Sequence, residues 1–314
     1  MAGVDTNQQR SAFIAETTAG TTPSTPGFST LHKAINRNAG PTRAHQASLP
    51  AGGGLLGDKL LTNKSSLTMP ATPMVYGLFD PSLETLFQSA WSTNVLKDGK
   101  SFKTVTVENS IPAGLAGTRT YWRDLGVRAT RGTLEMQADG IMTLALDFMG
   151  MTSQAATTTA ISGATYTDPT HSNPFTSAVD CGLVTLSGFT LDGMSEMKIN
   201  FDFDGIEGQA VQGTSLAGIT PGACRVSVDM KFYVDTNFLA MYTAPRQAAA
   251  QTATAFSVTM GSVTTNKYTF EIPKATIDVG DLDLAAATGY LTAKVVGQYS
   301  SSDACVMKLT RAVS

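Results

Sequence analysis

Along most of the chain, apolar residues alternate with polar ones, as in a β-strand that has one buried face and one wet face. The clearest runs cover residues 142–148, 197–203 and 226–234. Shorter runs predict further strands at 102–108, 121–130, 256–260, 267–277, 291–296 and 305–309. We therefore expect a mostly β fold, a sandwich or barrel with one or two helices.

One segment has helical spacing instead. Asp80 is a suitable N-cap residue, and Pro81 fits the first helical position. Apolar residues then follow at helical intervals, namely Leu83, Leu86, Phe87, Ala90 and Trp91. We expect Leu83, Leu86, Phe87 and Trp91 to pack this helix on a sheet.

The order of elements is repeated along the chain. The segment 80–87 has the same pattern as 235–242, and similar offsets bring 102–106 onto 256–260, 121–130 near 268–277, and 140–144 onto 289–293. This predicts two tandem β domains, at 31–150 and 180–314. One large sandwich with regular hairpins is the alternative.

Two segments lack this patterning. Residues 1–30 are rich in Thr, Pro and Gly, and we expect an extended N-terminal arm that orders only against another molecule. Residues 151–179 are polar and nearly free of charge, which predicts a linker or projecting loop between the two domains.

Composition narrows the function classes. Charged residues are only 15% of the 314 residues, and the net charge of −3 argues against a dedicated nucleic-acid binder. The three cysteines have no metal-binding or disulfide-framework spacing, which favours reduced thiols. We find no signal peptide or long apolar span and expect no membrane association.

Motifs that carry chemistry are scarce. The three histidines, His32, His45 and His171, lie in turn-rich segments, and no phosphate-loop, zinc-protease or hydrolase motif occurs. The acidic cluster Asp202, Asp204 and Glu207 lacks the register of a calcium loop, so we expect a hairpin with a charged turn. These absences predict a structural or binding protein, with no enzymatic activity, metal or cofactor.

Five stretches follow one another in a recognisable order along the chain, at 76–91, 95–108, 121–127, 232–239 and 268–274. In this ordered set the chain resembles the major tail tube proteins of long, non-contractile-tailed bacteriophages. The resemblance implies a β-sandwich with a short flanking helix, whose inner sheets join between subunits into a ring-wide barrel. Rings would stack head to tail into a virion tail tube that conducts DNA into the host, after assembly in the host cytoplasm.

The resemblance also implies partners. These are further copies of the chain, the tape measure, tail tip and tail terminator proteins, and double-stranded DNA that passes without specific binding. Two domains per chain favour a trimeric ring with pseudo-sixfold symmetry over a hexamer.

For the DNA to slide, the lumen must be neutral or acidic. We therefore take Asp202, Asp204, Glu207 and Asp229 as candidate residues of the lumen or of ring contacts. The alternative function is a β-sandwich adhesin or receptor-binding protein of the virion surface.

Overall fold

Strands dominate the fold, as the alternating sequence pattern predicts. The computed structural model describes residues 8–31, 35–37, 42–45, 58–112, 118–168, 173–187, 189, 191, 193–203, 206–209, 213–220, 222–234, 242–243, 254–283 and 289–312. The elements up to residue 167 are β1 (Arg10–Ala15), β2 (Gly27–Leu31), β3 (Asn36–Arg37), β4 (Thr42–His45), β5 (Asp58–Thr62), β6 (Ser65–Pro73), α1 (Asp80–Phe87), β7 (Val95–Lys97), β8 (Val105–Pro112), β9 (Arg119–Gln137), β10 (Thr143–Gly150), β11 (Thr152–Ser153) and β12 (Thr165–Thr167).

The remaining elements are α2 (Ser177–Asp180), β13 (Cys181–Leu186), β14 (Met194–Phe203), β15 (Ile206–Gln209), β16 (Leu216–Thr220), β17 (Cys224–Tyr233), β18 (Thr254–Met260), β19 (Tyr268–Asp283), β20 (Tyr290–Gly297) and β21 (Lys308–Arg311).

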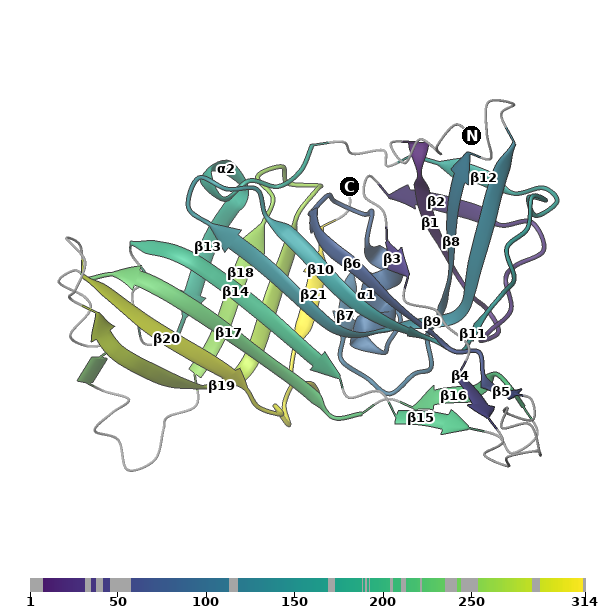
Figure 1. Cartoon of the computed structure of the whole chain (residues 1–314). Coiled ribbons are helices and arrows are strands. Elements are labelled where there is room, and N and C mark those ends of the chain that lie inside the picture. Colours follow the sequence, from purple (N-terminus) through teal and green to yellow (C-terminus); the bar gives the residue numbers. More distant parts are fainter. Residues whose placement is uncertain are drawn as a thin grey trace.

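One sheet runs through the whole molecule, and we call it the long sheet. Its strands pair in the order β3–β6–β10–β9–β14–β17–β20–β19, and all these pairs are antiparallel. Figure 1 shows it as a diagonal band from β6 and β10 to β19 and β20. The β9–β14 pair joins the earlier half of the chain to the later half.

Two smaller sheets lie behind the long sheet. The first back sheet is β12–β2–β1–β8–β9–β11, and the second is β13–β18–β19–β21–β7. The long strands β9 and β19 belong to both layers, because each leaves a back sheet and enters the long sheet. The hydrophobic core lies between the layers and includes Leu134, Ile199, Val228 and Phe270.

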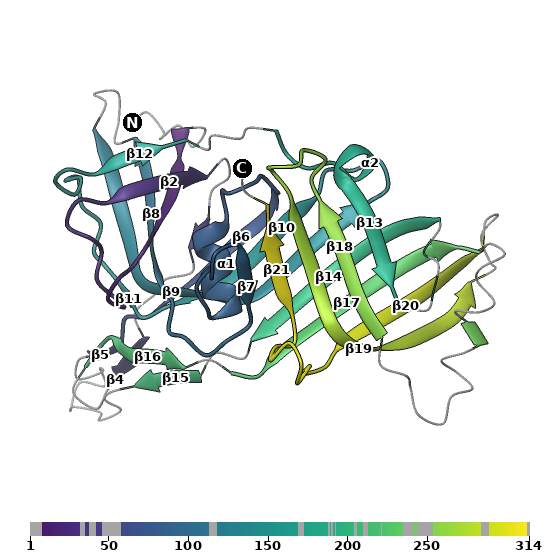
Figure 2. The same cartoon turned by 180° about the vertical axis from the view of Figure 1, so that it is seen from behind.

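Helix α1 lies behind the long sheet, between the two back sheets (Figure 2). Leu83, Leu86 and Phe87 are buried as predicted. The prediction is wrong in two details. The N-cap position is Phe79, while Asp80 is the first helical residue. The helix also ends at Phe87, because Gln88 takes a left-handed conformation, which leaves Ala90 and Trp91 outside it.

The expectation that the N-terminal arm orders only against another molecule is wrong for residues 8–30. Strand β1 pairs with β8 along its whole length and with β2 on its other side. Phe13 and Phe28 are 2% and 1% exposed, so this segment supplies part of the chain's own core.

Part of the expected linker 151–179 is also bound to the fold. Strand β12 pairs in parallel with β2, and the Tyr166 ring stacks on Phe28 with centroids 5.4 Å apart. Residues 151–168 therefore form a strap over the first back sheet and do not project from it.

Other boundaries shift by a few residues. The strand expected at 102 begins at Val105, and the one expected at 305 begins at Lys308. The hairpin expected after Asp202 is larger than a charged turn, because β14 returns as β17 only after the inserted pair β15–β16.

The earlier and later strands follow one order of pairing. β1–β8–β9–β11 corresponds to β13–β18–β19–β21, and β6–β10–β9 corresponds to β17–β20–β19. The register also shifts at the same place in both halves. In β8–β9 the shift lies between the pairs Val105–Val127 and Val107–Asp124. In β18–β19 it lies between the pairs Thr254–Ala275 and Phe256–Ile272. The repeat expected at 235–242 lies, apart from Tyr242, outside the described residues.

Candidate functional site

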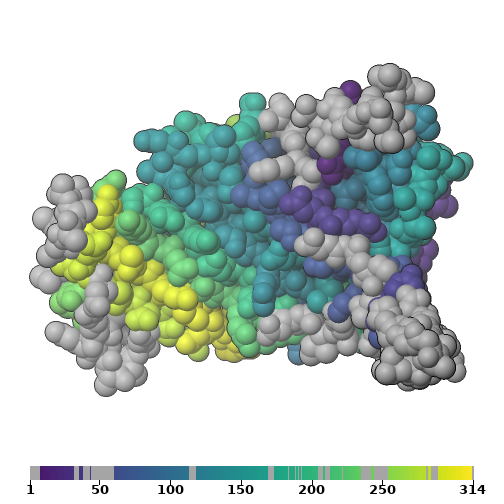
Figure 3. Space-filling model, in the orientation of Figure 1, coloured from purple at the N-terminus to yellow at the C-terminus, as the bar shows by residue number. Residues whose placement is uncertain are grey.

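The candidate site is the face of the long sheet that points away from the core, which we call the polar face. Along β14, Met197, Ile199 and Phe201 are buried, while the residues between them reach solvent. The same alternation continues through β17 and β20. In Figure 3 the strands of this face lie side by side from teal to yellow.

Residues of opposite charge alternate from strand to strand across this face, in a line that we call the first charged row. Asp147 faces Arg131, Arg131 faces Asp202, and Asp202 faces Arg225 on successive strands. The Arg131 Nε atom lies 3.4 Å from Asp202 Oδ1. Because these side chains are largely exposed, such a pair stabilises the fold by at most ~1 kcal/mol.

A second charged row runs parallel to the first. In strand order it consists of Glu135, Lys198, Asp229, Lys294 and Asp278. Asp229 Oδ1 lies 4.0 Å from Lys294 Nζ, and Asp229 Oδ2 accepts a 2.7 Å hydrogen bond from Asn200 Nδ2. Between the two rows lies a neutral row that includes Thr133, Asn200, Ser227 and Val296.

This alternation cancels the field of the face. Charges of opposite sign on strands ~4.8 Å apart repeat about every 10 Å, so the potential of a row decays within ~1.5 Å of the charges. The two rows hold five acids and four bases, a net charge of −1. A polyanion that moves over the face therefore meets neither strong attraction nor strong repulsion.

The structure brings two of the four predicted lumen or ring-contact residues together. Asp202 and Asp229 lie on neighbouring strands of the polar face, one in each charged row. Asp204 lies outside the described residues, and Glu207 lies in β15, where the backbone alone is described. The sequence reasoning missed the bases Arg131, Lys198, Arg225 and Lys294, which the alternation of β9, β14, β17 and β20 could have revealed.

A partly buried polar cluster ties α1 to the last strand. Asp80 accepts a 2.6 Å hydrogen bond from the Tyr268 hydroxyl and pairs with Arg311 of β21. Burial raises the pKa of the Asp80 carboxyl, although both partners lower it. The Arg311 guanidinium also lies 4.4 Å from the centre of the Trp91 ring. Trp91, which we expected to pack the helix on the sheet, therefore contacts this cluster from a position beyond the end of the helix.

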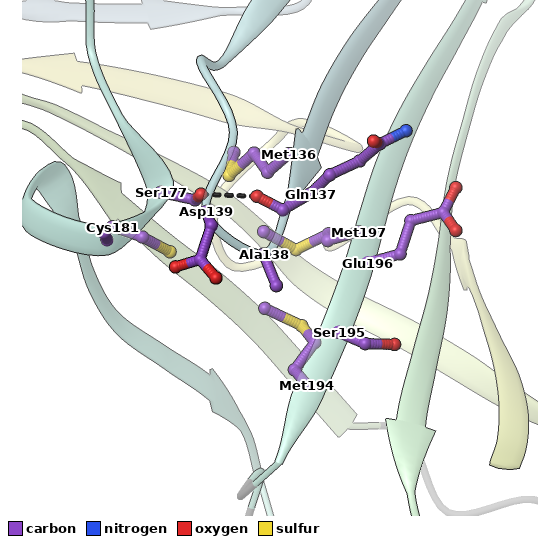
Figure 4. Close-up of a pocket in the computed structure, with 11 residues that line it drawn as sticks. Met136, Gln137, Ala138, Asp139, Ser177, Cys181, Met194, Ser195, Glu196 and Met197 are labelled. Atoms are coloured by element: carbon purple, nitrogen blue, oxygen red, sulfur yellow. Dashed lines mark hydrogen bonds between the residues drawn. The ribbon is translucent and has the colours of Figure 1, made fainter. Parts of the chain in front are cut away.

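A pocket lies at one end of the β9–β14 joint. Figure 4 shows it lined by Met136, Met194 and Met197, with Asp139 on the side of Cys181 and Glu196 on the opposite side. Burial raises the pKa of the Cys181 thiol, so the unreactive thiol form prevails at neutral pH. The described lining contains no histidine, lysine or arginine that would lower this pKa, and we assign no chemistry to the pocket.

Metal clusters, membrane-spanning helices and disulfide bonds are all absent from the described residues. No group of three or more His, Cys, Asp or Glu side chains is arranged to hold a metal ion. Where the chain is described, no helix is long and apolar enough to cross a membrane. Cys181, Cys224 and Cys305 form no disulfide bond.

The chain matches a known protein family. A family model described as "Phage tail tube protein" matches residues 6–293, which is most of the chain. No curated protein matches it.

Proposed function

Because the chain belongs to the phage tail tube protein family, whose members are structural proteins of the virion tail, we propose that it assembles into closed rings that stack into a DNA-conducting tube. The observation that carries the proposal is the long sheet, which continues through both halves of the chain with one covered face and one polar face.

The polar face is the lumen face in this proposal. A closed barrel has one face outside and one inside, and here α1 and both back sheets cover the face with the buried side chains. The polar face is left to line the lumen. Asp202 and Asp229 would then face the DNA path.

The repeated order of pairing supports two tube domains per chain, and therefore a trimeric ring with pseudo-sixfold symmetry. Each chain contributes the eight strands of the long sheet, with β3 and β19 at its two ends. Three chains give about 24 strands, and a tilt of ~40° gives a barrel roughly 45–50 Å across between backbones. A DNA duplex fits within it.

The charged rows suit passage without binding. Double-stranded DNA carries about one charge per 1.7 Å, so a basic lining would hold it by releasing counterions. The alternating rows oppose this, because each base is neutralised by acids on the neighbouring strands. The tape measure, tail tip and tail terminator proteins are the partners that this role requires.

Electron microscopy of the purified protein over a concentration series tests the proposal. We expect hollow rings and stacked tubes, with three identical chains per ring by mass measurement. Closed rings of six chains would retain the tube function and reject the trimer. Compact particles without a lumen, also when an isolated tail tip is added as initiator, would contradict the proposal and favour the adhesin alternative.

A further inference from the structure

The inserted hairpins of the two halves differ in what they contact. The β15–β16 hairpin belongs to the later half of the chain but is docked on the earlier half. Leu216 and Ile219 are 2% and 0% exposed. The Leu216 N–H donates to the Met151 carbonyl at 3.0 Å, and the Ile219 carbonyl accepts from Arg128 Nη1 at 2.8 Å.

The β4–β5 hairpin occupies the corresponding place between β3 and β6. Its base pair, Thr42 with Thr62, corresponds to Ile206 with Thr220. In β5, Thr62 is 6% exposed, whereas Leu60 and Leu61 beside it are 39% and 48% exposed. The β4–β5 hairpin therefore carries two apolar side chains that the single chain leaves in solvent, whereas β15–β16 buries Leu216 and Ile219.

The surface that receives β15–β16 also has a counterpart. Arg128 pairs with Met149, one residue before Gly150 at the end of β10. In the later half, Thr276 pairs with Val296, one residue before Gly297 at the end of β20. Val296 and the nearby Tyr299 are 40% and 60% exposed, so the counterpart is also an uncovered apolar surface.

One chain cannot bring these two surfaces together. In Figure 1 the β4–β5 hairpin lies at the end of the molecule opposite to β19 and β20. It extends from β3, the end strand of the long sheet, as β15–β16 extends from β14 beneath the neighbouring half. If the β4–β5 hairpin and the surface at the end of β19 and β20 are covered as their counterparts are, each must be covered by the other one in a second molecule.

We propose that the β4–β5 hairpin docks on a second copy of this chain, against Thr276, Val296 and Tyr299, and so clamps neighbouring subunits of the ring. The contact within the chain, between β15–β16 and the Arg128–Met149 surface, is the template for this contact between chains. The inference rests on the proposed ring assembly and names the apolar contact that closes it.

Two variants probe the two sides of this contact. Leu60→Asp with Leu61→Asp alters the hairpin, and Val296→Asp alters the receiving surface. Because these side chains are exposed in the single chain, both variants should unfold at the same urea concentration as the parent protein. Each should need at least about a tenfold higher protein concentration to form rings, because buried leucine or valine contacts are lost. The matched control is Val263→Asp, in the exposed turn between β18 and β19, which should assemble like the parent.

Labelling of an introduced thiol gives an independent readout. In a background with Cys181→Ser and Cys224→Ser, a maleimide should label Leu61→Cys in the monomer and not in assembled rings. Val263→Cys should be labelled in both states, while Cys305 is 0% exposed and stays silent. Rings that form normally from the hairpin variant, or that leave Leu61→Cys reactive, overturn the inference and leave the tube function intact. If the parent protein forms no ring, the proposed function itself fails.

Discussion

The two back sheets have the same strand order but different chemistry at one matched position. In the first, Glu108 on β8 faces Arg123 on β9. In the second, Ser257 on β18 faces Glu271 on β19. Glu108 is 1% exposed, whereas Ser257 is half-buried. The difference arises because the strap of residues 151–168 covers the first back sheet, and the second has no such cover in the described chain.

Because the strap covers the Glu108–Arg123 pair, the hydrogen-bonding groups of these two side chains need partners within the protein. Glu108 accepts hydrogen bonds from Arg123 Nε at 2.8 Å and from the Tyr166 hydroxyl at 2.7 Å, and Arg10 lies 3.7 Å away. Burial and the Glu108 carboxylate raise the pKa of Tyr166. A carboxylate on the covered sheet, such as Glu108, can thus remain charged because protein groups hydrogen-bond to it. On the uncovered sheet, water can solvate charged side chains such as Glu271.

The largest expected effect comes from breaking the covered pair. Glu108→Ala should lower the free energy of unfolding by about 3–5 kcal/mol, because the buried Arg123 and the half-buried Tyr166 lose their acceptor. Ser257→Ala at the matched open position should cost about 1 kcal/mol or less, the value of its hydrogen bond with Thr185. Urea unfolding followed by circular dichroism measures both. Equal losses for the two variants would show that the strap does not create the difference.

A smaller effect is expected where α1 meets β9. A Cβ atom added at Gly132 would lie 2.9 Å from Leu146 Cδ2 and 3.3 Å from both Leu86 Cδ2 and Phe201 Cδ2. Gly132→Val should therefore lower stability by about 1–3 kcal/mol, since Leu146 of β10 and Leu86 of α1 must both shift to make room. Gly218→Val is the matched control, because a Cβ there meets only Phe102, at 4.0 Å. If both variants have the same urea midpoint, the helix is not held by close packing at Gly132.

The sequence predicted the strands whose own alternation is complete, and failed where the partner is distant. The alternation within residues 142–148, 197–203 and 226–234 predicts one buried face even when the neighbouring strands are not known. Strand β1 has only a short apolar run among Thr and Gly, and its partner β8 lies almost 100 residues later. The strap is similar, because its partners are distant in the sequence: β12 pairs with β2, and Tyr166 stacks on Phe28.

The candidate site was predictable only in part, for the same physical reason. Asp202 and Asp229 could be placed on wet strand faces, because alternation alone decides the face. The charged rows depend on the register between strands, and Arg131 and Asp202 face each other only in the folded sheet. Acidic residues considered without their partners suggested an acidic surface, whereas the sheet makes it nearly neutral.

The smallest effect on stability, and the most informative for function, should come from the charged rows. Asp202→Lys with Asp229→Lys replaces alternating charge by a run of positive charge in each of the two charged rows, and should change the free energy of unfolding by ~1 kcal/mol or less per site. Tubes of this variant should retain double-stranded DNA at 50 mM salt and lose it steeply towards 200 mM, because each new base–phosphate contact releases counterions. Co-sedimentation of tubes with DNA measures this, with Asp202→Asn and Asp229→Asn as the control for lost charge alone. Tubes of the lysine variant that retain no more DNA than the parent would mean that the polar face does not line the DNA path.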